Sequence, residues 1–242
     1  MKRITIITAF MLTVTVLLYG QNPDRHVADT GTYLSGIKKA LTVPWPGNHT
    51  INLVFHGHSV PAGYRDKHEV HTLEAYPNLV LRALKEQYPY AVINIIVTAI
   101  GGENSASGEA RFEKEVLPYR PDVLFIDYAL NDRGLGLAKA RAAWEGMIKT
   151  ALKAGIKVIL LTPSPDVRVD IFAKDSRSLE AHAAQIRELA AQYHTGLADP
   201  FARFQEIARR EGTIKPYMGS VNHPNDKGHQ VIATEIMKWF TN

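Results

Sequence analysis

Ser59 and His223 are the two residues of this sequence best suited to nucleophilic chemistry. Ser59 sits in a turn at residues 57–63, directly after the apolar run 51–55, and the glycines of that turn leave the serine hydroxyl exposed. His223 lies just before the last helical segment, where a loop can bring an imidazole back over the first strand. An imidazole beside a serine can take the hydroxyl proton and so activate the oxygen as a nucleophile. Each residue alone is weak evidence, because a Gly/Ser turn after a strand is usually only a turn.

Two further turns carry groups that can bind a developing negative charge. Gly102 lies in the segment 99–105, where a backbone N–H can face a site without a Cβ in the way. Asn131 follows a third apolar run and offers a side-chain amide. Such donors stabilise the oxyanion that forms when a nucleophile attacks an ester carbonyl. Because an Asn-Asp pair is also typical of a capped turn, Asn131 becomes informative only together with the other segments.

These turns follow strand-like runs that alternate with segments of helical period. The strand candidates are residues 51–55, 91–97, 122–128, 157–162 and 195–198. The helix candidates lie near residues 73–88, 107–117, 137–154, 175–193, 201–210 and 226–240. Alternation of this kind predicts a parallel sheet that is covered by helices on both faces. Ligands of such sheets gather beyond the carboxyl ends of the strands, so the turns that carry Ser59, Gly102 and Asn131 are expected to meet at one edge.

The order and spacing of the four segments resemble those of the SGNH hydrolases, the GDSL-like lipases and esterases. The turn around Ser59 resembles the family's Gly-Asp-Ser-(x)3-Gly, and Gly102 falls at the glycine of the second block. Asn131 lies in a segment similar to the third block, and His223 lies in one similar to the fifth. The resemblance spans residues 51–240 and implies a three-layer α/β/α sandwich with a five-stranded parallel, flavodoxin-like sheet.

The resemblance implies a serine esterase in which Ser59 is the nucleophile and His223 is the general base. The N–H groups of Ser59 and Gly102, together with the Asn131 amide, would hold the oxyanion. No metal or other cofactor would be needed. We expect a small-molecule or glycan ester as the substrate, with an acetyl group on a carbohydrate favoured, because the sequence begins like an exported protein and has no apolar lid-like segment.

Two positions depart from the family pattern. His58 stands where the family has an aspartate before the nucleophile, and Ser220 stands where it has an acid three residues before the histidine. That acid fixes the imidazole tautomer and stabilises the imidazolium. The substitutes are the carbonyl or hydroxyl of Ser220, in a Ser-His dyad that we favour, or a carboxylate of Asp166 or Asp170 from the loop after the fourth strand. Asp226 is close in sequence, but its place in the first turn of the last helix favours capping.

Four histidines near the nucleophile allow a different interpretation. His56, His58, His68 and His71 form two pairs, spaced by two and three residues, and imidazole is a common metal ligand. The first pair straddles a glycine in a turn, and the acids nearby form no recognised ligand pattern, so we expect no bound metal. A metal-dependent phosphoesterase is one alternative function. A non-catalytic carbohydrate-binding protein is another, because it would explain the missing acid.

The first residues have the layout of a cleavable secretory signal, in which Lys2 and Arg3 precede an apolar run. The alternative is an uncleaved membrane anchor, since the run is nearly long enough to span a bilayer. We expect a signal peptide at 1–20, an N-terminal extension at 21–48 and the esterase domain at 49–242. The protein would then be secreted or periplasmic, without stable membrane association after cleavage.

The composition narrows the classes of protein further. The 242 residues include no cysteine, which excludes disulfides and thiol catalysis. Of the 28 Lys and Arg residues, two lie in the predicted signal, so 26 basic residues face 24 acidic ones. Such an even balance does not suggest a nucleic-acid partner.

Overall fold

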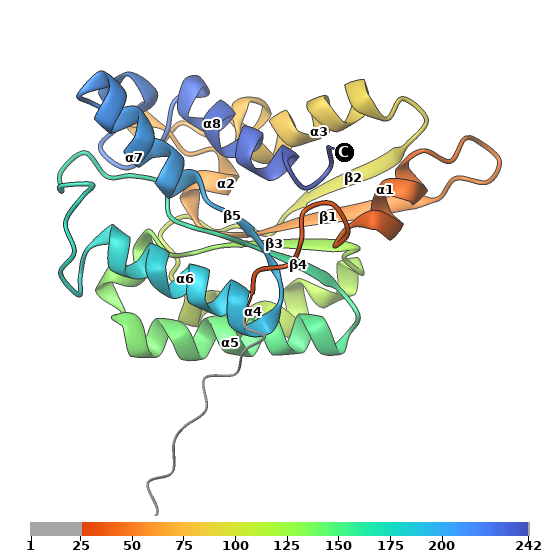
Figure 1. The fold of residues 1–242 in the computed structure, drawn as a ribbon, viewed down its shortest axis with the longest axis horizontal. Helices are drawn as coiled ribbons and strands as arrows, with labels where there is room; N and C mark the ends of the chain where they lie inside the picture. Colours follow the sequence, from red (N-terminus) through yellow and green to blue (C-terminus); the bar gives the residue numbers. More distant parts are fainter. Residues whose placement is uncertain (1–25, 242) are drawn as a thin grey trace, which may run out of the picture.

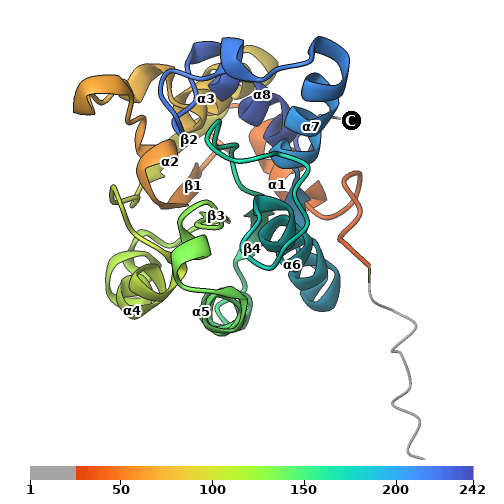
Figure 2. The same cartoon turned by 90° about the vertical axis from the view of Figure 1, so that its left-hand side faces the viewer.

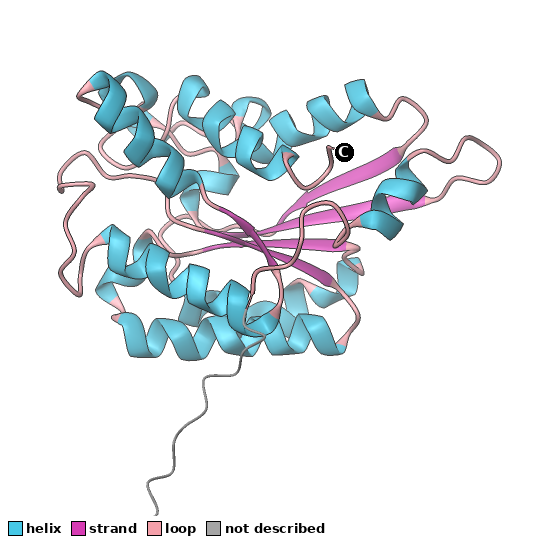
Figure 3. Ribbon diagram, in the orientation of Figure 1, coloured by secondary structure: helices cyan, strands magenta, loops and turns pink. Residues whose placement is uncertain are grey.

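The computed structural model describes residues 26–241 and shows a three-layer α/β/α sandwich (Figures 1 and 3). All five strands are parallel and follow the order β2-β1-β3-β4-β5. The strands are β1 (Thr50–Gly57), β2 (Val92–Val97), β3 (Val123–Asp127), β4 (Lys157–Leu161) and β5 (Gly196–Ala198). This order is that of flavodoxin-like sheets, so the structure confirms the predicted fold class.

Helices cover both faces of the sheet, as the view along the strands shows (Figure 2). One face carries α1 (Ser35–Leu41), α3 (Tyr76–Gln87), α7 (Pro200–Glu211) and α8 (Asp226–Met237). The other face carries α4 (Ser105–Glu115), α5 (Leu137–Lys153) and α6 (Leu179–Tyr193). The connections contain the short helix α2 (Ser59–Ala62) and the 3-10 turns η1 (Asp66–His68), η2 (Thr72–Glu74), η3 (Leu117–Tyr119), η4 (Asn131–Gly134) and η5 (Lys215–Tyr217).

Strand β3 shows why the sheet is apolar at consecutive positions. All five of its residues are buried, and alternate side chains enter opposite cores. Val123 and Phe125 belong to the core under α3, α7 and α8, whereas Leu124 and Ile126 belong to the core under α4, α5 and α6. A parallel strand with helices on both faces needs such a continuous apolar run.

The structure confirms the five predicted strands and the six predicted helices, and their ends differ by at most four residues. The largest difference is at the start of α6, which begins at Leu179 rather than near residue 175. Ser178 sets that boundary, because its hydroxyl accepts a hydrogen bond from the Ala181 N–H at 3.1 Å and so caps the helix.

The segment before β1 packs against the domain from residue 26 onward. Leu34, the N-cap of α1, and Leu41, its last residue, are buried in the core. The Tyr33 hydroxyl bonds to the backbone of Val158 in β4, and burial raises the pKa of that tyrosine. The predicted signal peptide, residues 1–20, lies outside the described residues, and within residues 26–241 no helix is long and apolar enough to cross a membrane.

Candidate active site

Ser59 begins helix α2 at the carboxyl end of β1. Gly57 pairs with Asp127 at the end of β3, and a Cβ on Gly57 would lie 2.6 Å from the Asp127 carbonyl oxygen and 2.8 Å from the Pro61 ring. Gly63 ends α2 with a φ of 90°, in the left-handed region. The two glycines of the turn therefore serve different needs, since Gly57 allows close approach of two strands and Gly63 allows a positive φ.

The loop before α8 brings His223 to Ser59. Nε2 of His223 lies 2.9 Å from Oγ of Ser59, which is 7% exposed. The loop is folded on itself: the Gly219 N–H donates to the His223 carbonyl at 2.9 Å, and the Asn225 N–H donates to the Tyr217 carbonyl at 3.0 Å. A serine hydroxyl at this distance from an imidazole can transfer its proton directly.

Ser220 occupies the other side of the imidazole. Its Oγ lies 3.0 Å from Nδ1 of His223, so the ring stands between two hydroxyl groups. For Nε2 to accept the Ser59 proton, the hydrogen of the neutral ring must sit on Nδ1, and Ser220 Oγ is then its acceptor. Of the substitutes that the sequence left open for the missing acid, the structure puts the Ser220 hydroxyl at Nδ1.

The two carboxylates considered for the same place are engaged elsewhere. Asp166 is buried, and its carboxylate accepts hydrogen bonds from Arg133 at 2.7 Å and from Arg168 at 2.7 and 2.9 Å. Burial favours a higher pKa for Asp166, but the bonds from Arg168 and Arg133 outweigh it and lower that pKa to about 2. Asp170 is exposed, and its carboxylate accepts from the Phe172 N–H at 2.9 Å within its own turn.

The first turn of α8 also differs in detail from the sequence expectation. Asn225, not Asp226, is the N-cap, because its side chain accepts from the Gly228 N–H at 3.2 Å. Asp226 is the first residue of the helix and forms an ion pair with Arg65. Gly228 is required here, since a Cβ would lie within 2.6 Å of Pro224.

The loop between β2 and α4 lies against the turn that carries Ser59. The Ile100 N–H donates to the Gly57 carbonyl at 3.1 Å. Gly102 follows with a φ of 83°, which is the left-handed region that glycine tolerates. The loop therefore carries the Gly102 N–H on the same edge of the sheet as Ser59.

Asn131 joins this loop to the end of β3. Its side-chain amide donates to the Glu103 carbonyl at 2.8 Å, which uses one of its two N–H groups. The neighbouring Asp132 is fully buried and accepts from the Ser105 N–H at 2.8 Å and from the Trp144 indole at 2.7 Å. Burial raises the pKa of Asp132, and these two hydrogen bonds act in the opposite direction. The Asn131-Asp132 pair therefore ties three elements together at the site.

Arg111 of α4 forms hydrogen bonds with the loop between β2 and α4. Its guanidinium makes hydrogen bonds to both carboxylate oxygens of Glu103, the shortest at 2.6 Å, and to the Thr98 carbonyl at 2.6 Å. Burial acts to lower the pKa of Arg111, but the bonds to Glu103 outweigh it and raise that pKa. Both ends of the loop are thus attached to one side chain.

Tyr64 is a site residue that the sequence reasoning missed. Its ring lies nearly parallel to the His223 imidazole, with centroids 6.4 Å apart and an interplanar angle of 29°. A Cβ on Gly101 would lie only 3.0 to 3.3 Å from the same ring. Tyr64 therefore stands between the histidine and the glycine loop. The only signal in the sequence was its position directly after Gly63.

The histidines considered as metal ligands have separate environments. His56 is buried and lies within hydrogen-bonding distance of Thr98 Oγ1, the Gly108 carbonyl and the Tyr128 hydroxyl, and burial lowers its pKa to about 3. His58 is buried beside Asp127, whereas His71 pairs with Glu69 at the surface. The side chain of His68 is not described. Among the described residues, no three His, Asp or Glu side chains gather closely enough to hold a metal ion.

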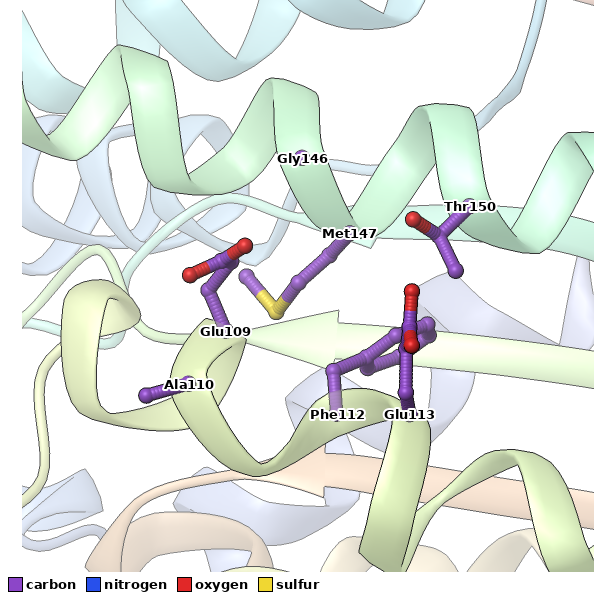
Figure 4. A pocket seen from close by; sticks show the side chains of 7 residues that line it. All are labelled: Glu109, Ala110, Phe112, Glu113, Gly146, Met147 and Thr150. Carbon is purple, nitrogen blue, oxygen red and sulfur yellow. The ribbon is translucent and has the colours of Figure 1, made fainter.

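One surface pocket lies away from the site, and one groove lies next to it. A pocket between α4 and α5 contains none of the site residues (Figure 4). Its lining residues are Glu109, Ala110, Phe112, Glu113, Gly146, Met147 and Thr150. A groove of about 530 Å³ lies beside the histidine loop instead. Its lining residues are Asp66, Val167, Lys215, Met218, Gly219, Ser220 and Val221.

A flavodoxin-like sheet with a serine-histidine pair at its carboxyl edge defines a hydrolase of the SGNH class. Residues 55–231 match the model of the GDSL-like Lipase/Acylhydrolase family, and the chain belongs to this family. It is therefore a carboxylic ester hydrolase, as the sequence predicted. A comparison with curated protein sequences found no match.

Solved structures with the same fold include several esterases. Axe2, an acetylxylan esterase from Geobacillus stearothermophilus, is 19% identical with a TM-score of 0.67, over 79% of this chain and 94% of that chain. The acetyl xylan esterase AlAXEase is 22% identical with a TM-score of 0.62, over 77% and 98%. A two-domain esterase (CEX) active on acetylated mannans is 20% identical with a TM-score of 0.69, over 86% of this chain and 52% of that chain. This chain thus spans about half of the two-domain enzyme.

Proposed function

We propose that this protein is an exported serine esterase that removes a small acyl group, favoured as acetyl, from a carbohydrate. The observation that carries the proposal is the line from Ser59 Oγ to His223 Nε2 at 2.9 Å and from His223 Nδ1 to Ser220 Oγ at 3.0 Å. A nucleophile, a base and a group that orients the base are the minimum for acyl transfer through a covalent intermediate.

The reaction proceeds in two halves. His223 Nε2 takes the Ser59 proton as Oγ attacks the ester carbonyl, and the tetrahedral oxyanion is held by the N–H groups of Ser59 and Gly102. The second amide N–H of Asn131 is the third donor, since the first is used by Glu103. The ester C–O bond breaks, the alcohol leaves with the proton from His223, and Ser59 keeps the acyl group. Water, deprotonated by His223, then releases the acid and restores the serine.

The surroundings of Ser59 favour a small acyl group. Tyr64 stands against Gly101 and beside His223, so we expect its ring to limit the space for an acyl group on Ser59. On the other side of the histidine, the groove by Ser220 combines apolar surface with the charged residues Asp66 and Lys215, and a sugar chain can bind in a groove that offers both kinds of contact. The acetylated glycans named for the solved structures above agree with this substrate class.

Hydrolysis of p-nitrophenyl acetate by the wild type, by Ser59→Ala and with a chelator tests the proposal. We expect turnover by the wild type with or without chelator, and none above the uncatalysed rate by Ser59→Ala, because the nucleophile is gone. Ser107→Ala is the matched control, since Ser107 is an exposed serine on α4 outside the site. Chelator-sensitive turnover would favour the metal-dependent phosphoesterase, and no turnover at all would favour the carbohydrate-binding protein.

The substrate and the export each need a separate measurement. Acetate release from acetylated xylan and mannan oligosaccharides should exceed hydrolysis of a long-chain p-nitrophenyl ester, and the reverse order would contradict the substrate class. Export is supported by the basic and then apolar residues at 1–20. N-terminal sequencing of the protein recovered outside the cytoplasm should begin after residue 20, whereas an intact N-terminus on a membrane-bound protein would indicate an anchor.

A further inference from the structure

His58, the residue before the nucleophile, is buried opposite a carboxylate. Its Nε2 lies 3.4 Å from Asp127 Oδ1, and the two side chains are 0% and 4% exposed. The distance is within ion-pair range, but neither atom makes an aligned hydrogen bond. Tyr76, also fully buried, donates from its hydroxyl to Asp127 Oδ2 at 3.1 Å. A buried row of imidazole, carboxylate and phenol therefore lies under the turn that carries Ser59, and the reaction described above does not use it.

The hydrogen-bond partner of Nδ1 decides which nitrogen of His58 carries the hydrogen. The Val60 N–H donates to His58 Nδ1 at 3.3 Å, so Nδ1 presents a lone pair. The hydrogen of the neutral ring is then on Nε2, where it faces the Asp127 carboxylate. Asp127 thus favours the tautomer of His58 with the hydrogen on Nε2, which is also the tautomer that the hydrogen bond from the Val60 N–H requires.

The same bond makes His58 the N-cap of α2, the helix that Ser59 begins. A cap fixes the first turn of a helix, because it satisfies a backbone donor that has no partner within the helix. His58 Nδ1 is also 3.5 Å from Ser59 Oγ, farther than the 2.9 Å to His223 Nε2. With its lone pair engaged by Val60, His58 leaves the serine hydroxyl hydrogen to His223.

We propose that His58 and Asp127 act as one unit that positions Ser59 for His223. The inference rests on Ser59 being the nucleophile, as proposed above. The Asp127 carboxylate faces the Nε2–H of the imidazole at ion-pair distance and favours that tautomer, Nδ1 of the imidazole accepts from the Val60 N–H, and the turn fixed in this way directs Ser59 Oγ to His223. The family pattern has a carboxylate at position 58, and a carboxylate there would face Asp127 away from water. The two positions are therefore coupled by charge, since two buried carboxylates in contact repel each other.

A charge exchange tests the coupling. The variants are His58→Asp, Asp127→Asn and the double substitution. The measurements are kcat with p-nitrophenyl acetate, the rate constant for phosphonylation of Ser59 by a fluorophosphonate, and the free energy of unfolding in urea. We expect His58→Asp to lower kcat and the phosphonylation rate by about 10²-fold, as misplacement of a reacting group by about 1 Å does. Adding Asp127→Asn should recover roughly tenfold or more of that loss, because it removes the repulsion.

His58→Asn separates positioning from direct proton transfer. The Asn Oδ1 can accept from the Val60 N–H as the imidazole Nδ1 does, but the amide cannot take a proton from Ser59. We expect this variant to fold and to keep a phosphonylation rate within about tenfold of the wild type, since the cap survives. If His58→Asn instead loses phosphonylation as fully as His223→Ala does, His58 is itself the base and the positioning role is wrong.

Asp199→Asn is the matched control for Asp127→Asn. Asp199 is a partly buried carboxylate that caps α7 and pairs with Arg187, outside the serine turn. It should lower stability without rescuing His58→Asp. The proposal is overturned if the effects of His58→Asp and Asp127→Asn simply multiply, or if the double variant recovers only its free energy of unfolding. Failure of the proposed function looks different, because the wild type itself would then show neither turnover nor phosphonylation.

Discussion

Ser220 places a neutral hydroxyl where the family pattern has a carboxylate. At 3.0 Å from Nδ1 it can accept the imidazole hydrogen and so fix the tautomer of His223. A hydroxyl carries no charge, however, and stabilises the imidazolium less than a carboxylate does. We therefore expect Ser220 to orient His223 while contributing little to the energy of proton transfer.

Ser220→Asp should change the pH dependence of the reaction. A carboxylate at Nδ1 stabilises the imidazolium and raises the apparent pKa of His223, so the acid limb of the kcat/KM profile should move to higher pH. Turnover at the optimum should stay equal or rise. The measurement is kcat/KM with p-nitrophenyl acetate across the acid and neutral range.

Ser220→Ala is the companion variant, because it removes the hydroxyl and keeps the carbonyl. We expect it to lower kcat by up to roughly tenfold, the worth of one neutral hydrogen bond. The Ser220→Asp prediction would be contradicted by a folded but inactive protein, because that result would show that another acidic group already occupies the space beside Nδ1 of His223.

At the scale of single residues, the sequence indicated those site residues that belong to a recognisable motif. Ser59, Gly102, Asn131 and His223 stand in four ordered segments, and the structure brings Ser59 and His223 to 2.9 Å. The sequence favoured Ser220 as the replacement for the missing acid but left open whether its carbonyl or its hydroxyl meets the imidazole, since a side-chain rotamer decides this.

Tyr64 and Asp127 were not predicted as site residues. Asp127 contacts His58 because β1 and β3 pair in a particular register, and Tyr64 contacts His223 because the loop before α8 returns over α2. Both contacts are made by tertiary packing between segments that are distant in the chain. Neither leaves a local pattern in one sequence.

At the scale of elements, α4 controls the loop that carries Gly102. Arg111 holds both the Thr98 carbonyl at one end of the loop and the Glu103 carboxylate at the other. We expect Arg111→Ala to lower kcat by roughly tenfold with little change in KM, less than the 10²-fold or more expected from removing the Asn131 donor outright.

The control for this prediction is Arg141→Ala on α5. Arg141 makes comparable contacts with Glu145, Glu188 and Gln192, and none of these residues belongs to the site. Its kcat should equal that of the wild type. Equal losses in the two arginine variants would mean that α4 has no special relation to the loop.

The helices and strands followed from sequence periodicity, and the differences between the predicted and the observed elements have local causes. Helix α1 was not predicted, because seven residues are too few for a helical pattern to appear. The helix expected from residue 73 begins at Tyr76, since Thr72–Glu74 form a 3-10 turn and Pro77 favours the first turn of a helix. Period and length thus defined the elements, while turn chemistry defined their ends.

At the scale of the whole molecule, the buried histidines His56, His182 and His229 make the free energy of unfolding depend on pH, because burial lowers the pKa of each. Burial lowers the pKa of His56 and that of His229 from 6.5 to about 3. Between these values the unfolded chain binds protons that the folded chain excludes. Above pH 6.5 these histidines should leave the free energy of unfolding unchanged. As the pH drops from 6.5 toward 3, the free energy of unfolding should fall.

Urea unfolding at a series of pH values measures this decline. His229→Asn can keep an acceptor for the Tyr76 N–H, which donates to His229 Nδ1 at 3.2 Å, and should give a shallower decline. The ionised carboxylate of Asp166 loses its contribution to the free energy of unfolding only below pH 3.8, so it acts at the acid end of this pH range. A decline as steep in His229→Asn as in the wild type would contradict the role of that histidine.

Both ends of the described chain lie on the side of the molecule opposite Ser59. Lys38 of α1 donates to the Thr241 carbonyl, and His194 at the end of α6 contacts the His26 carbonyl, both near the amino ends of the strands (Figure 1). A tag, a linker to a solid support or a fused binding module attached near either end would therefore leave the Ser59 edge facing outward. Immobilised in this orientation, the protein could meet an insoluble polymer without its own attachment blocking access.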